Sequence, residues 1–235
     1  VIGTNGKLNP NATLGNRVVY NGQEYLLTPD DWEDIAFRSS MRQEYNVSVS
    51  GATDRSTFYA SFGYLNNEGI TENSNMERYT ARLKADYQAK KWLKVGANAG
   101  YANFTYNSLS ADGQGNSSAN LFAFTSSIPP IYPLYVRDGQ GNIMKNDAGI
   151  TMYDYGNGMN AGLTRPLLPN ANGLADSRLN TDRSEGNAFN GTGFFDILFL
   201  KDFKFTFNVG VSLDETRRTT VQNPYFGQFA GENGI

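Results

Sequence analysis

Carboxylates are the residues of this sequence that could still carry acid–base catalysis. The chain has 23 Asp and Glu residues and contains neither His nor Cys. The absence of both types excludes Ser-His-Asp and Cys-His catalysis, His-ligated zinc and Cys-based metal sites. A pair of carboxylates acting as general acid and base, as in glycoside hydrolysis, is the mechanism that survives. We predict no catalytic residue, no cofactor and no enzymatic activity.

One short motif has a spacing that could bind a cation. Asp-Gly-Gln-Gly-Asn occurs at 112–116 and again at 138–142. A calcium loop places oxygen ligands at alternate positions and ends on a glutamate, whereas here Gln stands between the Asp and Asn and no glutamate follows closely. Gly and Asn tolerate positive φ, so tight turns are the favoured interpretation and no metal is predicted. The second copy is expected to be the turn of a loop hairpin between 135–137 and 143–145.

Four acidic residues form a cluster nearer the start of the chain: Asp30, Asp31, Glu33 and Asp34. They follow Thr28, which can cap a helix, and Pro29, which suits the first helical position. Negative charge is favoured there because the N-terminus of a helix carries positive partial charge. We therefore predict a short helix over 29–37 and not a metal site. Before it, Asn21-Gly22 between two apolar stretches predicts a small hairpin.

Aromatic residues are the main candidates for binding. They stand in the segment 108–186, which lacks sustained periodicity and holds most of the prolines. On a surface loop, aromatic side chains can stack on sugars or anchor a partner, and they can equally pack a small core of the loop itself. The candidates for contact with substrate or partner are Phe122, Phe124, Tyr132, Tyr135, Tyr153 and Tyr155.

The elements around this segment alternate between apolar and polar side chains, with the period of two that is typical of β-strands. Each run has about 8 to 12 residues, whereas strands of soluble proteins usually have about 5–6. A strand of twelve residues spans about 40 Å, or roughly 30 Å when tilted near 40°, which is enough to cross the hydrocarbon of a membrane. The six predicted strands cover 45–51, 58–65, 79–90, 93–101, 188–199 and 203–214.

The connections between the predicted strands alternate between short and long. Tight turns are expected at 53–56, 90–92 and 200–202, and long connections at 66–78 and 108–186. Outer-membrane barrels likewise have short periplasmic turns and long extracellular loops. Aromatic residues also lie near strand ends, as in the interface girdles of such barrels: Tyr79, Tyr87, Trp92 and Tyr101.

The sequence therefore predicts an all-β fold that is part of a large antiparallel transmembrane β-barrel. Six strands are too few, because known barrels of this kind need at least eight and an open edge in lipid leaves backbone groups unpaired. Since the chain begins at Val1 and stops at Gly234-Ile235 in a loop-like stretch, we expect a piece of a longer chain. The expected division is a loop segment with the short helix (1–42), four barrel strands (43–107), a long extracellular loop (108–186), two barrel strands (187–216) and the start of the next loop (217–235).

Charge and hydropathy exclude two other classes. The formal net charge is −3, with 20 Lys and Arg, so no broad basic field is available for nucleic acid. The mean hydropathy is −0.49, and no stretch reaches the roughly 18 apolar residues of a membrane helix. Transmembrane strands escape that search because only every second residue is apolar.

Five segments in series carry a family resemblance. They are DWEDIAFR at 31–38, QEYNVSVSG at 43–51, FYASFGYLNNEGI at 58–70, ERYTARL at 77–83 and KWLKVG at 91–96. In this order they resemble the SusC/RagA-like TonB-dependent transporters. The resemblance covers 28–107 well and 187–214 more loosely.

The resemblance implies a 22-stranded barrel, closed by an N-terminal plug, that imports oligosaccharides or peptides across the bacterial outer membrane. It implies as partners a SusD-like surface lipoprotein that delivers substrate, TonB acting through the N-terminal part, the remainder of the barrel and outer-membrane lipid. The plug domain and the TonB box do not fall within this chain. No functional residue of the family is therefore assigned to it.

Two alternatives to an active importer stay open from the sequence. A passive porin-like barrel would have the same strands, and a plug domain upstream would argue against it. A soluble β-rich module that binds or hydrolyses glycans would also show alternating strands. The missing His disfavours its hydrolytic version, and a pair of carboxylates in a cleft would revive it.

Overall fold

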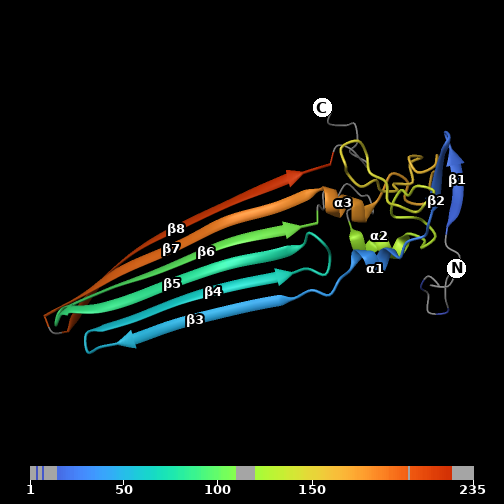
Figure 1. Cartoon of the computed structure of the whole chain (residues 1–235). Coiled ribbons are helices and arrows are strands. Elements are labelled where there is room, and N and C mark those ends of the chain that lie inside the picture. Colours follow the sequence, from blue (N-terminus) through green and yellow to red (C-terminus); the bar gives the residue numbers. More distant parts are fainter. Residues whose placement is uncertain (1–3, 5–6, 8–14, 110–119, 201, 224–235) are drawn as a thin grey trace.

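Six long strands form one antiparallel sheet in the computed structural model, which describes residues 4, 7, 15–109, 120–200 and 202–223. The strands follow one another in the sheet in the order of the sequence, from β3 to β8, so every neighbouring pair is joined by one connection (Figure 1). Six strands with period-two alternation are thus confirmed. Their bounds are β3 Arg42–Ala52, β4 Ser56–Glu68, β5 Asn75–Lys90, β6 Leu93–Ser108, β7 Thr181–Phe199 and β8 Phe203–Val221.

All three predicted tight turns lie at the same end of the sheet. There β3 joins β4, β5 joins β6 and β7 joins β8, while the connections from β4 to β5 and from β6 to β7 lie at the opposite end (Figure 1). The first of these is shorter than the predicted 66–78, because β4 continues to Glu68 and β5 begins at Asn75. Within the described residues, β3 and β8 each pair with a single strand, so the sheet is open.

The strands extend further toward the long connections than their apolar patterns indicate. β7 begins at Thr181, before the predicted start at 188, and β8 ends at Val221, beyond the predicted end at 214. The register nevertheless continues to the pair Thr181 and Val221. The added residues are mostly polar on both faces, so the period-two signal fades although the backbone pairing does not.

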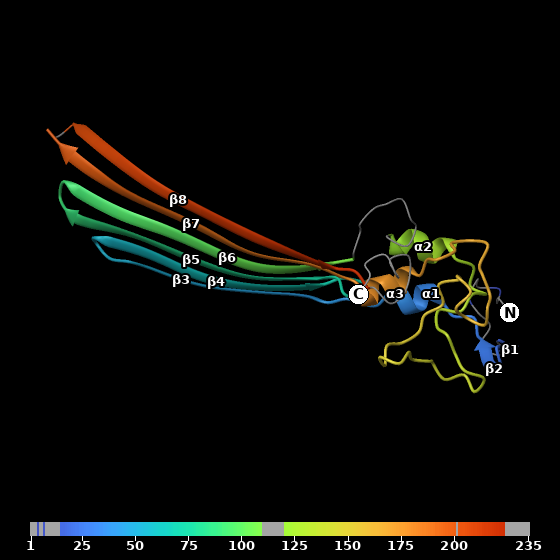
Figure 2. The ribbon, with the colours of Figure 1, turned by 90° about the horizontal axis from the view of Figure 1, so that it is seen from above.

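A second, smaller body lies at the end of the sheet that carries the long connections (Figure 2). We call it the loop unit, and it comprises residues 15–37 and 120–180. It contains the predicted hairpin, whose strands β1 (Asn16–Tyr20) and β2 (Gln23–Leu27) meet at Asn21 and Gly22 with φ of 50° and 81°. Positive φ at both central residues is the geometry of a tight hairpin turn.

The loop unit has three short helices, where the sequence predicts one. The predicted helix over 29–37 is confined to α1 (Trp32–Ala36), because Asp31 and not Thr28 is the cap and accepts from the Asp34 amide at 3.1 Å. α2 (Leu121–Ser127) and α3 (Gly173–Leu179) lie in the segment predicted as loop. Asn120 and Asn172 cap them by accepting from the amides of Ala123 and Ala175. Helices of two turns are too short to show a periodicity.

One hydrophobic core joins the three helices to the intervening segments. Trp32 of α1 meets Phe124 of α2 edge-on at 5.4 Å between ring centroids, and its indole N–H donates to the Tyr132 carbonyl at 3.0 Å. None of the helices of the described chain is both long enough and apolar enough to span a bilayer. The buried core consists of Trp32, Ala36, Leu121, Phe124, Ile128, Leu134, Tyr153, Tyr155, Ala171, Leu174 and Ala175.

Candidate functional site

One face of the sheet is apolar over a continuous band. The strand register places Val47, Phe62 and Ala81 in one row with Tyr101, Phe189 and Leu213. On β8 the band runs from Phe203 to Leu213, which at about 3.3 Å per residue and a tilt of about 40° gives a height of roughly 25 Å. That is the height of the apolar band of a transmembrane barrel.

The band ends in aromatic rows on both sides. Tyr45, Tyr64 and Tyr79 stack across three neighbouring strands, with ring centroids 6.3 and 5.0 Å apart. The hydroxyls of Tyr64 and Tyr79 both donate to Glu77 Oε1, at 3.1 and 2.8 Å, so the rings face the band and the hydroxyls face the polar rows beyond it. Toward the tight turns, Phe199 and Phe203 stack at 5.8 Å. Aromatic rows at both edges of an apolar band are typical of transmembrane barrels, and the Tyr rings add the polar group that suits a membrane interface.

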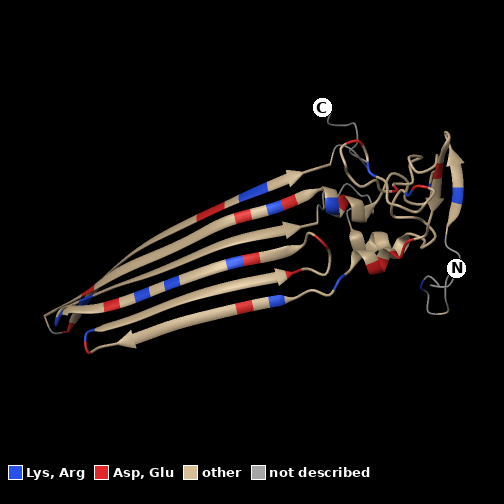
Figure 3. Cartoon of the chain, viewed as in Figure 1, with Lys and Arg blue, Asp and Glu red and all other residues tan. Residues whose placement is uncertain are grey.

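The opposite face of the sheet is polar and charged. Lys204 pairs with Asp196 at 2.8 Å across β7 and β8. β5 places Arg78, Arg82 and Lys84 on this face, alternating with apolar residues on the other. Figure 3 shows where charged residues lie along the strands, and long stretches of β4, β6 and β8 carry none. This distribution suits a wall with lipid on one side and water or polar protein on the other.

Polar contacts attach the loop unit to the rim of the sheet. Arg178 of α3 makes a bidentate ion pair with Glu72 in the connection from β4 to β5, at 2.5 and 3.1 Å, and its third nitrogen donates to the Tyr135 hydroxyl at 2.6 Å. The hydrogen bond from Arg178 lowers the pKa of Glu72 below its ordinary value. The Asn73 side chain donates to the Ser177 carbonyl at 2.8 Å. The loop unit is therefore held against the sheet.

Within the loop unit, the carboxylates of the buried Asp30 and the partly buried Asp176 have different environments. Asp30 accepts two hydrogen bonds from Arg137 at 2.7 and 3.0 Å and one from the Leu134 amide at 2.6 Å. Asp176 has no ion pair with a cation of the described residues and accepts from the Tyr155 hydroxyl at 3.2 Å. Burial raises the pKa of Asp176 to about 7, although the hydrogen bond from Tyr155 opposes the shift. This carboxyl gains or loses its proton near neutrality.

The six aromatic candidates are divided between the core and the surface. Phe124 and Tyr155 are fully buried and Tyr153 nearly so, so these three belong to the mini-core that the sequence left open as an alternative. Tyr132 and Tyr135 are partly buried. The exposed one, Phe122, stacks on Phe37 at 4.8 Å. A role in contact with substrate or partner stays a prediction for the loop as a whole.

The motif Asp-Gly-Gln-Gly-Asn forms a turn at its second occurrence. Asp138 accepts from the amides of Gln140 and Asn142 at 3.0 and 2.8 Å, and Arg137 pairs with Ile143, which confirms the predicted hairpin. Hydrogen bonding to Asn142 lowers the pKa of Asp138. The first occurrence, 112–116, lies outside the described residues. In the part of the chain that the structure describes, no group of three potential metal ligands comes together.

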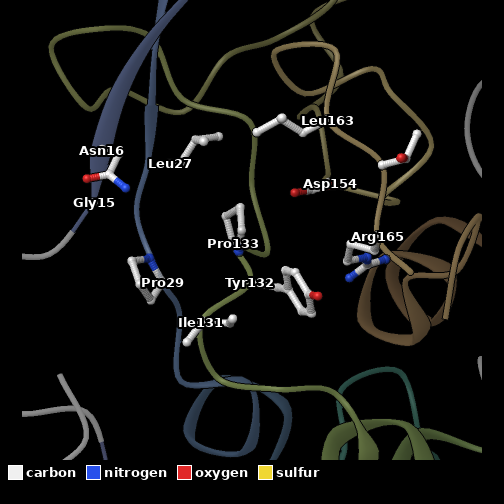
Figure 4. A pocket seen from close by; sticks show the side chains of 11 residues that line it. Gly15, Asn16, Leu27, Pro29, Ile131, Tyr132, Pro133, Asp154, Leu163 and Arg165 are labelled. Atoms are coloured by element: carbon white, nitrogen blue, oxygen red, sulfur yellow. The ribbon is translucent and has the colours of Figure 1, made fainter. Parts of the chain in front are cut away.

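A pocket of about 440 Å³ opens between the β2–α1 segment and the loop around Tyr132 and Arg165. Figure 4 shows Arg165 and Tyr132 side by side, with Leu27 and Pro29 on the segment opposite. The Arg165 guanidinium lies 5.7 Å from the centre of the Tyr132 ring. This pocket could not be predicted from the sequence, because a single Arg in an aperiodic segment matches no motif. It is lined by Gly15, Asn16, Leu27, Pro29, Ile131, Tyr132, Pro133, Asp154, Leu163, Thr164 and Arg165.

Comparison with known proteins relates the chain to TonB-dependent receptors. No family model matches the chain. It is 28% identical over 223 residues to the TonB-dependent receptor SusC of Bacteroides thetaiotaomicron, covering 87% of this chain and 20% of that protein. It is 27% identical over 167 residues to the TonB-dependent receptor P26 of Formosa agariphila, covering 71% of this chain and 14% of that protein. The chain is therefore similar to SusC and related TonB-dependent receptors.

Solved structures give the same fold. The RagAB peptide importer in its closed-closed state matches 93% of this chain and 22% of its own, with a TM-score of 0.62 at 24% identity. Its open-open state covers 90% of this chain and 21% of its own, with a TM-score of 0.60 at 23% identity. The predicted fold class, part of a large antiparallel barrel, is confirmed. The chain spans about a fifth or less of the curated relatives named above.

Proposed function

We propose that the protein containing this chain is an active importer of the bacterial outer membrane, which takes up oligosaccharides or peptides with energy supplied through TonB. The apolar band of about 25 Å edged by aromatic rows, in a chain similar to TonB-dependent receptors, is the observation that carries this proposal. In this role the chain binds and passes substrate and breaks no bond. The fully apolar outward rows would be unstable in water, which argues against the soluble module.

The loop unit supports a partner on the extracellular side. It has a core of its own and is held to the rim by the Arg178–Glu72 ion pair, so it can present a defined surface. We propose that a SusD-like lipoprotein docks at this end and delivers substrate. The similarity to the RagAB peptide importer favours peptides as one class of substrate.

The first experiment tests location and energy source together. The intact protein is recovered from membrane fractions and run with and without boiling in detergent. A band that migrates anomalously until boiled is expected for a closed barrel. Uptake of oligosaccharides or peptides by the cells is then measured with and without TonB. Uptake that stops when TonB is deleted supports the active importer, and uptake that continues indicates a passive porin. Recovery as a water-soluble protein contradicts the whole proposal.

A second experiment tests which end of the sheet faces outward. The chain contains no Cys, so a single Cys introduced into it is its unique label. Ala148→Cys in the loop unit should react with a membrane-impermeant maleimide on intact cells. Asp54→Cys, in the tight turn after β3, is the matched control and should react only after the outer membrane is permeabilised. The reverse pattern would invert the proposed orientation.

A further inference from the structure

The pocket of the loop unit contains a buried cation that is only partly paired. Arg165 has 4% of its surface exposed, and one guanidinium nitrogen donates to the Ala171 carbonyl. Its Nε and Nη1 have no hydrogen-bond partner among the described residues. A buried donor that makes no hydrogen bond carries a desolvation cost, and the cost is larger for a charged group. Such a group is retained where something else supplies the acceptors.

The nearest carboxylate does not supply them. Asp154 directs one oxygen to the Gly156 amide at 2.6 Å and the other to the Asn160 side chain at 3.0 Å. Although its charge acts on Arg165, no ion pair joins the two in the described part of the chain. Gly156 has no side chain between them, and a Cβ there would lie 2.1 Å from Arg165 Nε. Glycine at 156 therefore leaves room for the guanidinium. Asp154 accepts hydrogen bonds from other groups and not from Arg165.

The rest of the pocket is suited to an apolar group. Leu27, Pro29 and Ile131 contribute aliphatic walls, together with Pro133 and Leu163 (Figure 4). The volume of about 440 Å³ lies within the range of small-molecule sites. A planar guanidinium beside an aromatic ring in such a pocket matches the two oxygens of a carboxylate.

We infer that this pocket binds the carboxylate of a small ligand through Arg165, with the adjoining apolar part of the ligand against Leu27, Pro29 and Leu163. Two sources share this chemistry. One is the last residue of a peptide, with a free carboxylate and an apolar side chain. The other is a terminal uronic acid of an oligosaccharide. The aliphatic walls favour the peptide end. The site goes beyond the proposed import function, since binding here requires no transport.

The test is calorimetric titration of the intact detergent-purified protein with three probes. N-acetyl-leucine carries the carboxylate and an apolar side chain, N-acetyl-leucinamide has the same shape without the charge, and glucuronate is the acidic sugar. We expect N-acetyl-leucine to bind at least about tenfold more tightly than the amide, as for the loss of a charge-assisted hydrogen bond. If glucuronate binds more tightly than N-acetyl-leucine, the pocket is still a carboxylate site, but its ligand is an acidic sugar.

Paired variants separate the pocket from the fold. Arg165→Gln should weaken N-acetyl-leucine binding about tenfold or more, while Arg17→Gln removes an exposed cation of the same loop unit and should leave it unchanged. Because Arg165→Gln also alters a buried contact, Leu163→Trp provides a second route. Leu163 is 49% exposed and lines the pocket, and Leu167, 45% exposed in the same segment, lies outside it. Leu163→Trp should abolish binding and Leu167→Trp should not.

The outcomes that overturn the inference are equally definite. Equal affinity for the acid and the amide removes the role of the carboxylate. Undiminished binding in Arg165→Gln or in Leu163→Trp places the ligand elsewhere, and no heat with any probe shows that the site does not bind. Each of these results leaves the import function standing, since uptake and heat-dependent migration are measured separately.

Discussion

The sheet and the loop unit distribute their large apolar side chains in opposite ways. In the sheet, Val209 and Leu213 are 60% and 63% exposed, whereas Leu134 and Leu174 of the loop unit are fully buried. Both regions are rich in aromatic residues, so composition does not distinguish them. Under the proposed function the difference is one of solvent, because the sheet would face hydrocarbon whereas the loop unit has to bury its apolar surface in water. One chain therefore contains a sheet with its apolar side chains exposed and a small unit with an ordinary hydrophobic core.

The largest effect is expected in the core of the loop unit. Phe124→Ala should destabilise the unit by about 3–5 kcal/mol, because it removes a fully buried ring that packs against Trp32. Protease digestion of intact cells should then cleave within 120–180 while the barrel keeps its heat-dependent migration. Phe122→Ala, on the exposed side of α2, is the control and should remain resistant. Equal cleavage of both variants would contradict the buried core.

A charge on the apolar band tests the other half of the comparison. Val209→Arg should cost about 2–4 kcal/mol, the value for Arg near the middle of a bilayer, and reduce the folded protein in the outer membrane. The measurement is the fraction that migrates anomalously before boiling. Asn208→Arg is the matched control at nearly the same height on the opposite face, and it should assemble normally. If the two variants behave alike, the sheet does not separate lipid from a polar interior.

The partly buried carboxyl of Asp176 makes the loop unit sensitive to pH. Its pKa is raised to about 7, so the folded unit binds more protons than the unfolded chain between about pH 4 and pH 7. The contribution of this carboxyl to stability is therefore largest below about pH 4 and is lost as pH rises through 7, with a change of about 2 kcal/mol between pH 5 and pH 7. Protease resistance of the loop unit measured over this range should decline accordingly.

Asp176→Asn is the control for this pH dependence. It keeps the shape of the side chain, so the decline should become markedly shallower. Some decline in protease resistance with rising pH should persist, because burial also raises the pKa of Asp154. An unchanged profile in Asp176→Asn would assign the pH dependence to other groups.

The smallest effect is expected where the two regions meet. Arg178→Gln removes the ion pair with Glu72, which is partly exposed, so we expect a loss of about 1 kcal/mol. Amide hydrogen exchange at 70–74 should accelerate while exchange within β5 and β6 stays slow. Arg42→Gln breaks an exposed pair on β3 and should change neither. Faster exchange throughout the sheet would mean that the regions are not separate units.

The same contrast explains what could be predicted from the sequence. Period-two alternation in 79–90 and 203–214 fixes both strand and face, because each residue reports its own side of the sheet. The sequence does not contain a comparable local signal for the loop unit. Its core depends on contacts such as Trp32 with Phe124, which are remote in the chain, and α2 and α3 are too short for a helical pattern. Arg165 became a candidate only when the structure showed its missing partners.

The polar extensions of the strands have a mechanical consequence. Beyond the aromatic row, β7 and β8 remain paired from Glu215 to Val221, a stretch of about 20 Å along the strand. β5 and β6 are likewise paired up to Asn75 and Asn107. Because the backbone hydrogen bonding is continuous over this stretch, we expect the paired extensions to be stiff. If the loop unit tilts, the movement has to occur in the few residues that join it to the sheet, such as 38–41. A force applied to the loop unit is then transmitted to the strands of the sheet.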